Sequence, residues 1–196
     1  KKSKYVHMEL IKEIKHSSIL KNVFIALMGT ILLAISSKIK IPFYPVPMTM
    51  QTLVVLLLGI TLGWKLGVAT VALYLFEGII GLPVFSGSPE KGVGIVYFTG
   101  PTMGYLIGFL FTAYFAGSFN YNKGLLGWKL FIKFLHLSFS VSFIYIFGVI
   151  WLGILIGWEK PLFQIGVQPF LLAELFKISI VLISLSQFKK LNKYLK

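Results

Sequence analysis

The chain has 196 residues, of which 57% are hydrophobic and 13% charged, and its mean hydropathy is +0.85. The charged share is about half that of ordinary soluble domains, so the composition excludes a soluble protein and indicates one compact integral membrane domain. The absence of cysteine excludes disulfides, thiolate metal sites and cysteine nucleophiles. The net charge of +13 comes from lysines at the termini and in loops, without the interleaved readout residues of a nucleic-acid-binding protein.

Six apolar segments separated by Gly, Pro or Lys predict an all-α integral membrane protein with six transmembrane helices in a compact bundle. In chain order they cover residues 20–37, 48–62, 64–80, 101–118, 130–157 and 169–188. This divides the chain into an N-terminal segment (1–18), a membrane domain (19–190) and a tail (191–196). The prolines in the stretch 41–47 exclude a helix there, so we expect an ordered, extended connection. The N-terminal segment suits a helix on the membrane surface or a solvated tail equally well.

The lysines also predict the orientation in the membrane. With six spans both termini lie on one side, and most of the lysines fall on that side. The exceptions on the opposite side are Lys38, Lys40, Lys91 and Lys160. Because cytoplasmic loops carry the excess of basic residues, both termini are expected to be cytoplasmic.

One ion pair is predicted inside the last span. At about 1.5 Å rise per residue, Lys177 lies about 12 Å along a helix that starts near Pro169, close to the middle of a hydrocarbon layer about 30 Å thick. Glu174 precedes it by three residues and so lies on the same helix face. Intramembrane charges cost several kcal/mol and mark functional sites, which favours a binding site for a polar ligand. The alternative is a self-satisfied pair that only helps the helix to pack.

Other candidate groups lie near the outer ends of the helices. Gln51 is one turn into a short helix, where an amide has little reason to face lipid. Glu77 either points into the same cavity as Lys177 or reaches the outer headgroups. The loop 81–94 has four glycines and is expected to form a lid, although an ordered loop without a gating role is the alternative. Aromatic residues near this loop could wall an apolar pocket: Phe85, Tyr97 and Tyr105.

Two stripes of small residues predict close helix packing in lipid. In the fourth helix the stripe includes Gly104 and Gly108, and packing inside the chain's own bundle is the favoured interpretation. In the first helix the stripe includes Ala26 and Thr30, and it could face either this bundle or a partner.

Nothing in the sequence supports catalysis. There is no P-loop motif for ATP, the three histidines lack metal-ligand spacing, and no Ser-His-acid set can be assembled. We therefore predict no catalytic residues, no metal and no cofactor.

Four motifs together carry a specific resemblance. Residues 45–53 (PVPMTMQTL), 74–87 (YLFEGIIGLPVFSG), 100–109 (GPTMGYLIGF) and 168–177 (QPFLLAELFK) resemble, in this order, the motifs of the BioY family. These proteins are the biotin-specific S components of energy-coupling-factor (ECF) transporters. The resemblance covers most of the chain.

The resemblance implies a six-helix protein of the bacterial cytoplasmic membrane that binds biotin from the outside. It also implies docking onto a membrane T component that carries two cytoplasmic ATPases. The family's small-residue partner face carries over onto Ala26 and Thr30, and its last-helix acid and lysine carry over onto Glu174 and Lys177. We assign Glu174 to the ureido N–H groups of biotin and Lys177 to an anionic or carbonyl oxygen. Further ligand contacts are expected from Gln51 and from aromatic walls: Tyr74, Phe85 and Tyr105.

Three departures from the family pattern bear on these assignments. The family's acid is typically Asp, so Glu174 is one methylene longer, and Met103 stands where a small residue is usual. The chain has no Arg for the biotin carboxylate, which leaves Lys177, Lys91 or backbone N–H groups of the glycine-rich loop. Two other functions stay open: an S component for another small vitamin, and a small intramembrane enzyme built around Glu174.

Overall fold

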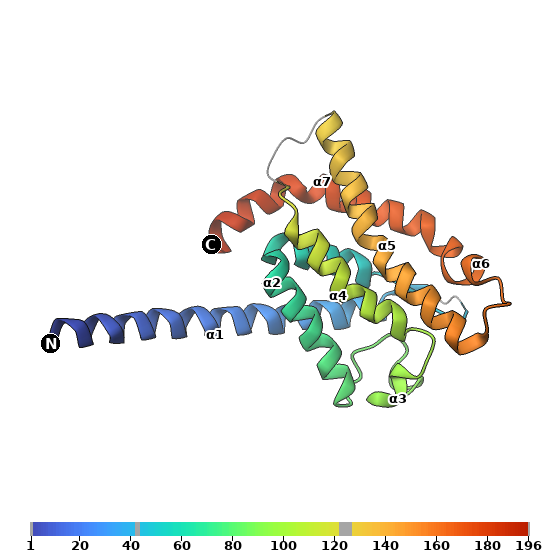
Figure 1. The fold of residues 1–196 in the computed structure, drawn as a ribbon, viewed down its shortest axis with the longest axis horizontal. Helices are drawn as coiled ribbons and strands as arrows, with labels where there is room; N and C mark the ends of the chain where they lie inside the picture. The colour runs from blue at the N-terminus through green and yellow to red at the C-terminus, as the bar shows by residue number, and fades with distance from the viewer. Residues whose placement is uncertain (1, 42–43, 122–126, 196) are drawn as a thin grey trace.

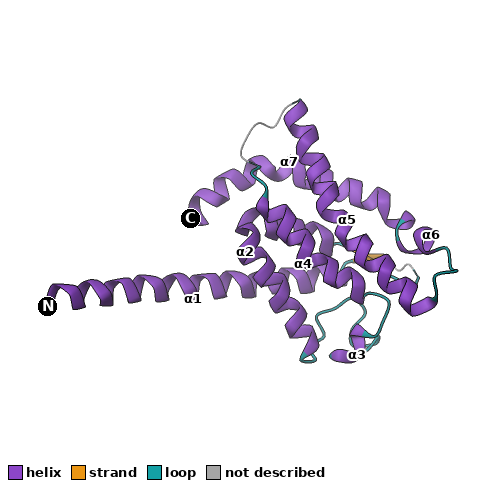
Figure 2. Cartoon of the chain, viewed as in Figure 1, coloured by secondary structure: helices purple, strands orange, loops and turns teal. Residues whose placement is uncertain are grey.

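The computed structural model describes residues 2–41, 44–121 and 127–195, and the side chains of 18–41, 44–121 and 127–185. Within these residues the regular secondary structure is helical apart from one short antiparallel ladder, and loops join the elements (Figure 2). The elements, labelled in Figure 1, are α1 (Lys2–Lys38), β1 (Lys40–Ile41), β2 (Met48–Thr49), α2 (Gln51–Ile79), α3 (Ile95–Phe98), α4 (Met103–Ser118), α5 (Trp128–Ile156), α6 (Leu162–Gly166), the 3₁₀ turn η1 (Gln168–Phe170) and α7 (Leu171–Leu195).

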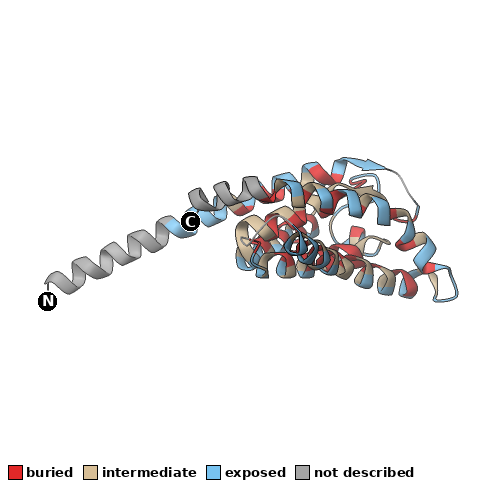
Figure 3. Ribbon diagram, turned by 90° about the horizontal axis from the view of Figure 1, so that it is seen from above, coloured by how far each residue is buried: buried red, intermediate tan, exposed pale blue. Residues whose placement is uncertain are grey.

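Several of these helices are suited to a bilayer. In the described part of the chain, four stretches are long and apolar enough to cross a membrane: Ser18–Lys38, Gln51–Ile79, Trp128–Ile156 and Leu162–Leu185. Helix α4 is shorter but also apolar. Large apolar side chains such as Phe24 and Ile183 are 64% and 78% exposed on the outside of the bundle, where exposed segments alternate with buried ones (Figure 3). An all-helical, multi-pass membrane protein is therefore confirmed.

Helix α2 contains the break predicted between 62 and 64. Gly63 has a φ of +75°, a conformation open to glycine and strained for other residues. The two halves of α2 fold back on each other from this point (Figure 1). A Cβ built on Gly67 would lie only 3.1 Å from the Cα of Gly59, so these glycines let the two halves pack backbone to backbone. One continuous run of helical residues thus supplies two short antiparallel helices.

The small-residue stripe of α4 packs against α5. A Cβ built on Gly104 would collide with the backbone carbonyl of Phe147, and one on Gly108 with the Cα of Ile144. Thr112, one turn further, donates a hydrogen bond to the carbonyl of Ser140 at 2.9 Å. The favoured interpretation of this stripe, packing inside the bundle, is confirmed.

Gly108→Ala should therefore destabilise the protein. The added methyl group meets the main chain of α5 rather than a movable side chain, and overpacking of this kind costs about 1–3 kcal/mol. Thermal unfolding in detergent should show a clearly lower midpoint for Gly108→Ala. Ser118→Val, which adds bulk at the exposed end of the same helix, is the control and should unfold like the unaltered chain. Equal midpoints for both variants would contradict the close α4–α5 contact.

The ends of the predicted helices differ in three places. Helix α1 runs without a break from Lys2, whereas the first span was predicted to begin at residue 20. The connection predicted over 41–47 joins β1 to β2, in which Lys40 lies opposite Thr49, and its residues 42 and 43 lie outside the described part of the chain. The short helix α6 was not predicted. It precedes η1 because Pro169 interrupts the helix that would otherwise continue into α7.

Candidate functional site

A small buried cavity lies where the start of α2 meets α4, α5 and α7. Its volume is about 50 Å³. Four of the predicted ligand residues line it, together with Thr52 and Tyr145, which the sequence did not single out. The four predicted residues are Gln51, Tyr105, Glu174 and Lys177. The polar residues predicted from separate motifs thus meet in one place.

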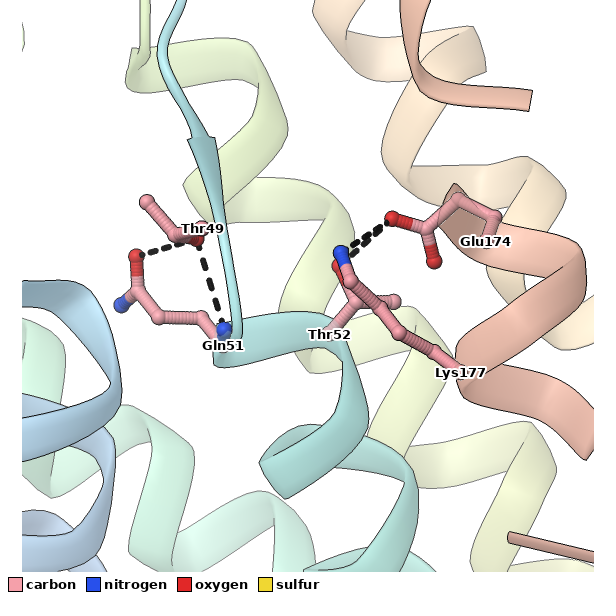
Figure 4. A network of polar contacts seen from close by, with 5 residues as sticks. All are labelled: Thr49, Gln51, Thr52, Glu174 and Lys177. Atoms are coloured by element: carbon pink, nitrogen blue, oxygen red, sulfur yellow. Dashed lines mark hydrogen bonds and ion pairs between the residues drawn. The ribbon is translucent and has the colours of Figure 1, made fainter. Parts of the chain in front are cut away.

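The ion pair forms as predicted, at the wall of this cavity. Lys177 Nζ lies 2.7 Å from Glu174 Oε1, and the Thr52 hydroxyl donates a hydrogen bond to the same oxygen at 3.2 Å (Figure 4). Glu174 and Lys177 are only 5% and 3% exposed, so both charges are withdrawn from solvent. The second carboxylate oxygen, Oε2, is buried and has no hydrogen-bond partner in the described structure. A buried acceptor without a partner is costly, which suits an oxygen that meets a ligand donor.

Gln51 is held in a defined orientation beside this pair. Its Nε2 donates to the Tyr74 hydroxyl at 2.8 Å, and its Oε1 accepts from Thr49 at 3.2 Å. The Tyr74 hydroxyl in turn donates to the carbonyl of Val84 at 3.0 Å. Gln51 lines the cavity, but its amide is directed away from the Glu174–Lys177 pair (Figure 4) and is held there by these partners.

Aromatic rings form much of the remaining wall. Tyr105 and Tyr145 meet edge to face at 6.1 Å between ring centroids, and Tyr145 lies 6.0 Å from Phe170. The Tyr105 hydroxyl donates to the carbonyl of Gly166 at 2.9 Å, which fixes the ring in place. Tyr145 lies in the long apolar stretch of α5, where no motif distinguishes a cavity residue from an ordinary core residue.

Two of the predicted wall residues lie one layer behind the cavity. Tyr74 and Phe85 are 0% and 1% exposed and are absent from its lining. Phe85 stacks on Tyr97 with centroids 4.7 Å apart, and Tyr97 is the ring that reaches the cavity. In this structure the two rings therefore support the wall from behind, since Tyr74 bonds to Gln51 and Phe85 stacks on Tyr97.

A second, larger cavity of about 460 Å³ adjoins the first. Tyr97 and Thr102 line both cavities, so these two side chains form the partition between them. Lys91 and Tyr44, which is 95% exposed, lie on the larger cavity. We call this larger cavity the antechamber, and the Lys91 ammonium group places a cation on its wall.

The first-helix stripe faces inward. Ala26 and Thr30 are 7% and 2% exposed, and the Thr30 hydroxyl donates to Glu77 Oε1 at 2.9 Å. Glu77 is therefore absent from the lining of the cavity that holds Lys177. Its carboxylate instead accepts this hydrogen bond from α1. The face of α1 that is exposed carries large apolar residues such as Leu27 and Ile31. In this structure Ala26 and Thr30 are covered by the chain's own α2, so the expected partner face is not open there.

The comparison with known families decides the relationship. The model of the BioY family matches residues 7–194, almost the whole chain. The chain belongs to the BioY family.

Among the described residues, no group of three His, Asp or Glu side chains is placed to hold a metal ion.

Two BioY relatives and one solved structure are similar to this chain over most of their length. The probable biotin transporter BioY of Pyrococcus horikoshii is 31% identical over 83% of this chain and 93% of its own. The biotin transporter BioY of Thermotoga maritima is 34% identical over 83% and 92%. The crystal structure of an S-component for biotin from an ECF-type ABC transporter superposes with a TM-score of 0.67 at 26% identity, covering 89% of this chain and 93% of that one.

Proposed function

We infer that this chain captures biotin for uptake across a membrane. Its membership of the BioY family and its likeness to a biotin S-component support this function. The observation that carries it in this chain is the buried Glu174 carboxylate, with one oxygen paired to Lys177 and the other unpartnered beside a cavity.

The chemistry of biotin matches the groups around the site. Its ureido N–H groups need an acceptor, which Glu174 Oε2 supplies. A carbonyl or carboxylate oxygen needs a donor, and the Lys177 ammonium has three N–H groups, one of which is directed to Glu174. The apolar rings need flat apolar walls, which Tyr105 and Tyr145 supply. We place the carboxylate tail toward Lys91 in the antechamber, since the chain has no arginine.

Binding requires the partition to move. A cavity of about 50 Å³ holds one or two water molecules at about 30 Å³ each. Ligand sites usually enclose about 300–1,000 Å³, a range that the buried cavity reaches when it is joined to the antechamber of about 460 Å³. We propose that the partition opens at Thr102 on binding, while Tyr97 keeps its hydrogen bond to the Ser86 carbonyl, and that the two spaces then merge around the ligand.

The proposed topology has six spans and two cytoplasmic termini, in the cytoplasmic membrane of a bacterium. The two halves of α2, divided at Gly63, bring the apolar helices to six with α1, α4, α5 and α7. The basic residues at both termini and in the loops on the same side support the orientation.

The energy for uptake has to come from other chains. The sequence holds no P-loop, and the solved relative is an S-component of an ECF-type ABC transporter. We propose that the chain docks onto a T component with two ATPases and that biotin is released to the cytoplasm from that complex. Catalysis by Glu174 is the remaining alternative from another class.

Biotin should co-purify with the detergent-extracted protein. Mass spectrometry of the released small molecules, followed by calorimetric titration with a panel of vitamins, tests this directly. We expect unmodified biotin and tight binding of biotin alone. Another vitamin in its place would point to a different S component, and a chemically altered ligand would point to an enzyme.

A further inference from the structure

The C-terminal end of α1 holds the glycine-rich loop through a single ammonium group. Lys38 Nζ donates to the carbonyl oxygens of Pro83, Phe85 and Ser88 at 2.8, 2.9 and 3.0 Å. The Ser88 hydroxyl lies 3.2 Å from the same nitrogen. Three carbonyls arranged around one cation satisfy all three of its N–H donors. Charge-assisted bonds of this kind are stronger than neutral ones.

Neighbouring side chains hold the carbonyls between these points. Ser37, also on α1, donates to the carbonyl of Val84 at 2.7 Å, and Tyr97 donates to the carbonyl of Ser86 at 2.7 Å. The segment 83–88 is therefore fixed at nearly every carbonyl. Within the loop 81–94 that the sequence predicted to be a lid, this part is anchored, and any closing motion has to come from elsewhere.

The anchored segment delivers one polar group to the buried cavity. Ser86 is 4% exposed and lines the cavity. Its hydroxyl is buried and has no hydrogen-bond partner in the part of the chain that the structure describes. Its own backbone carbonyl is occupied by Tyr97. A hydroxyl that is held this firmly and left unpartnered at a cavity wall suits a hydrogen bond to a ligand oxygen.

We propose that Ser86 is a ligand-binding residue and that Lys38 is the positioning residue that keeps it in place. This rests on the proposed function, with biotin as the ligand. The Ser86 hydroxyl donates to a carbonyl or carboxylate oxygen of biotin, and Lys38 does not touch the ligand. Lys38 acts instead by fixing the three carbonyls on either side of Ser86.

A double-mutant cycle tests the link between the two residues. Ser86→Ala should raise the Kd for biotin about fivefold, as expected for one lost hydrogen bond. Lys38→Met removes the cation but keeps an unbranched side chain only one atom shorter, and should raise the Kd by at least as much. Because Lys38 acts through Ser86, the double variant should bind no worse than Lys38→Met alone. Effects that multiply in the double variant would overturn the link.

Amide hydrogen exchange tests the anchoring without any ligand. Lys38→Met should speed exchange at Val84 and Ser88, whose N–H groups are bonded within the loop. Lys40→Met, which removes an exposed charge two residues away on the same side, is the matched control and should leave exchange and Kd unchanged. Unchanged exchange in Lys38→Met would overturn the anchoring role. Failure of the unaltered chain to bind biotin would overturn the proposed function and the Ser86 contact, while the exchange result would still decide the role of Lys38.

Discussion

Lys177→Met should weaken biotin binding at least tenfold and should also lower the stability of the ligand-free protein. Removing one partner of a buried ion pair leaves the other charge uncompensated, at a cost of about 3–5 kcal/mol. In this chain that partner is Glu174, which is 5% exposed and would keep the hydrogen bond from Thr52 but no opposite charge at hydrogen-bond distance. Calorimetric titration with biotin and thermal unfolding in detergent measure the two effects separately.

The single variant cannot by itself distinguish a ligand site from an ion pair that only helps α7 to pack, because the protein should lose stability in either case. The double variant Glu174→Gln/Lys177→Met separates these alternatives. It removes both charges, so the folding cost of an unpaired charge disappears and the unfolding midpoint should return toward that of the unaltered chain.

The recovery of stability should not restore binding. If Glu174 accepts the ureido N–H groups and Lys177 donates to a ligand oxygen, the stable double variant still binds biotin at least tenfold more weakly. A double variant that is stable and binds biotin normally would show that the pair serves packing alone. Met103→Ala offers a control near the same helices that leaves both charges in place.

The chemistry of the site was predictable from sequence because lipid makes polar residues conspicuous. Glu174, Lys177 and Gln51 stand out in apolar stretches, where each must have a partner, and all three do line one cavity. The break at Gly63 and the close packing at Gly104 and Gly108 were predictable for a related reason, since glycine in such helices marks a turn or a close approach.

The aromatic wall was not predictable in the same way. Tyr74 and Phe85 belong to recognisable motifs, yet they support Gln51 and Tyr97 from behind. Tyr145 lines the cavity but lies in a helix where aromatic residues are common on every face. Which ring reaches a cavity depends on how its helix is rotated about its axis. A helix that is apolar on all sides has no polar face from which this rotation could be predicted.

The role of Lys38 was also not predictable. From the sequence, Lys38 served only to predict the orientation in the membrane, because its carbonyl partners depend on the path of a loop that the sequence does not specify.

Ala26→Trp should abolish or severely reduce biotin binding by the isolated protein, whereas Leu27→Trp should leave it intact. The two positions are adjacent on α1, but Ala26 is 7% exposed and Leu27 is 45% exposed. An indole at position 26 has no space between α1 and α2 and forces the two helices apart. The loss of stability should exceed about 1–3 kcal/mol, the usual cost of adding a few atoms to a packed core. At position 27 the same indole lies on the apolar outer face.

Thr30→Trp and Ile31→Trp repeat the comparison one turn along the helix, at 2% and 51% exposure. Thr30→Trp also removes the hydrogen bond to Glu77, so it should lower the unfolding midpoint further than Ala26→Trp. The measurements are the unfolding midpoint and the biotin Kd of each purified variant. Normal folding and binding in Ala26→Trp and Thr30→Trp, with loss of ATP-driven uptake in a reconstituted complex, would instead place the partner face on the small-residue stripe. Loss of uptake in Leu27→Trp and Ile31→Trp, with binding retained, would place it on the exposed apolar face of α1.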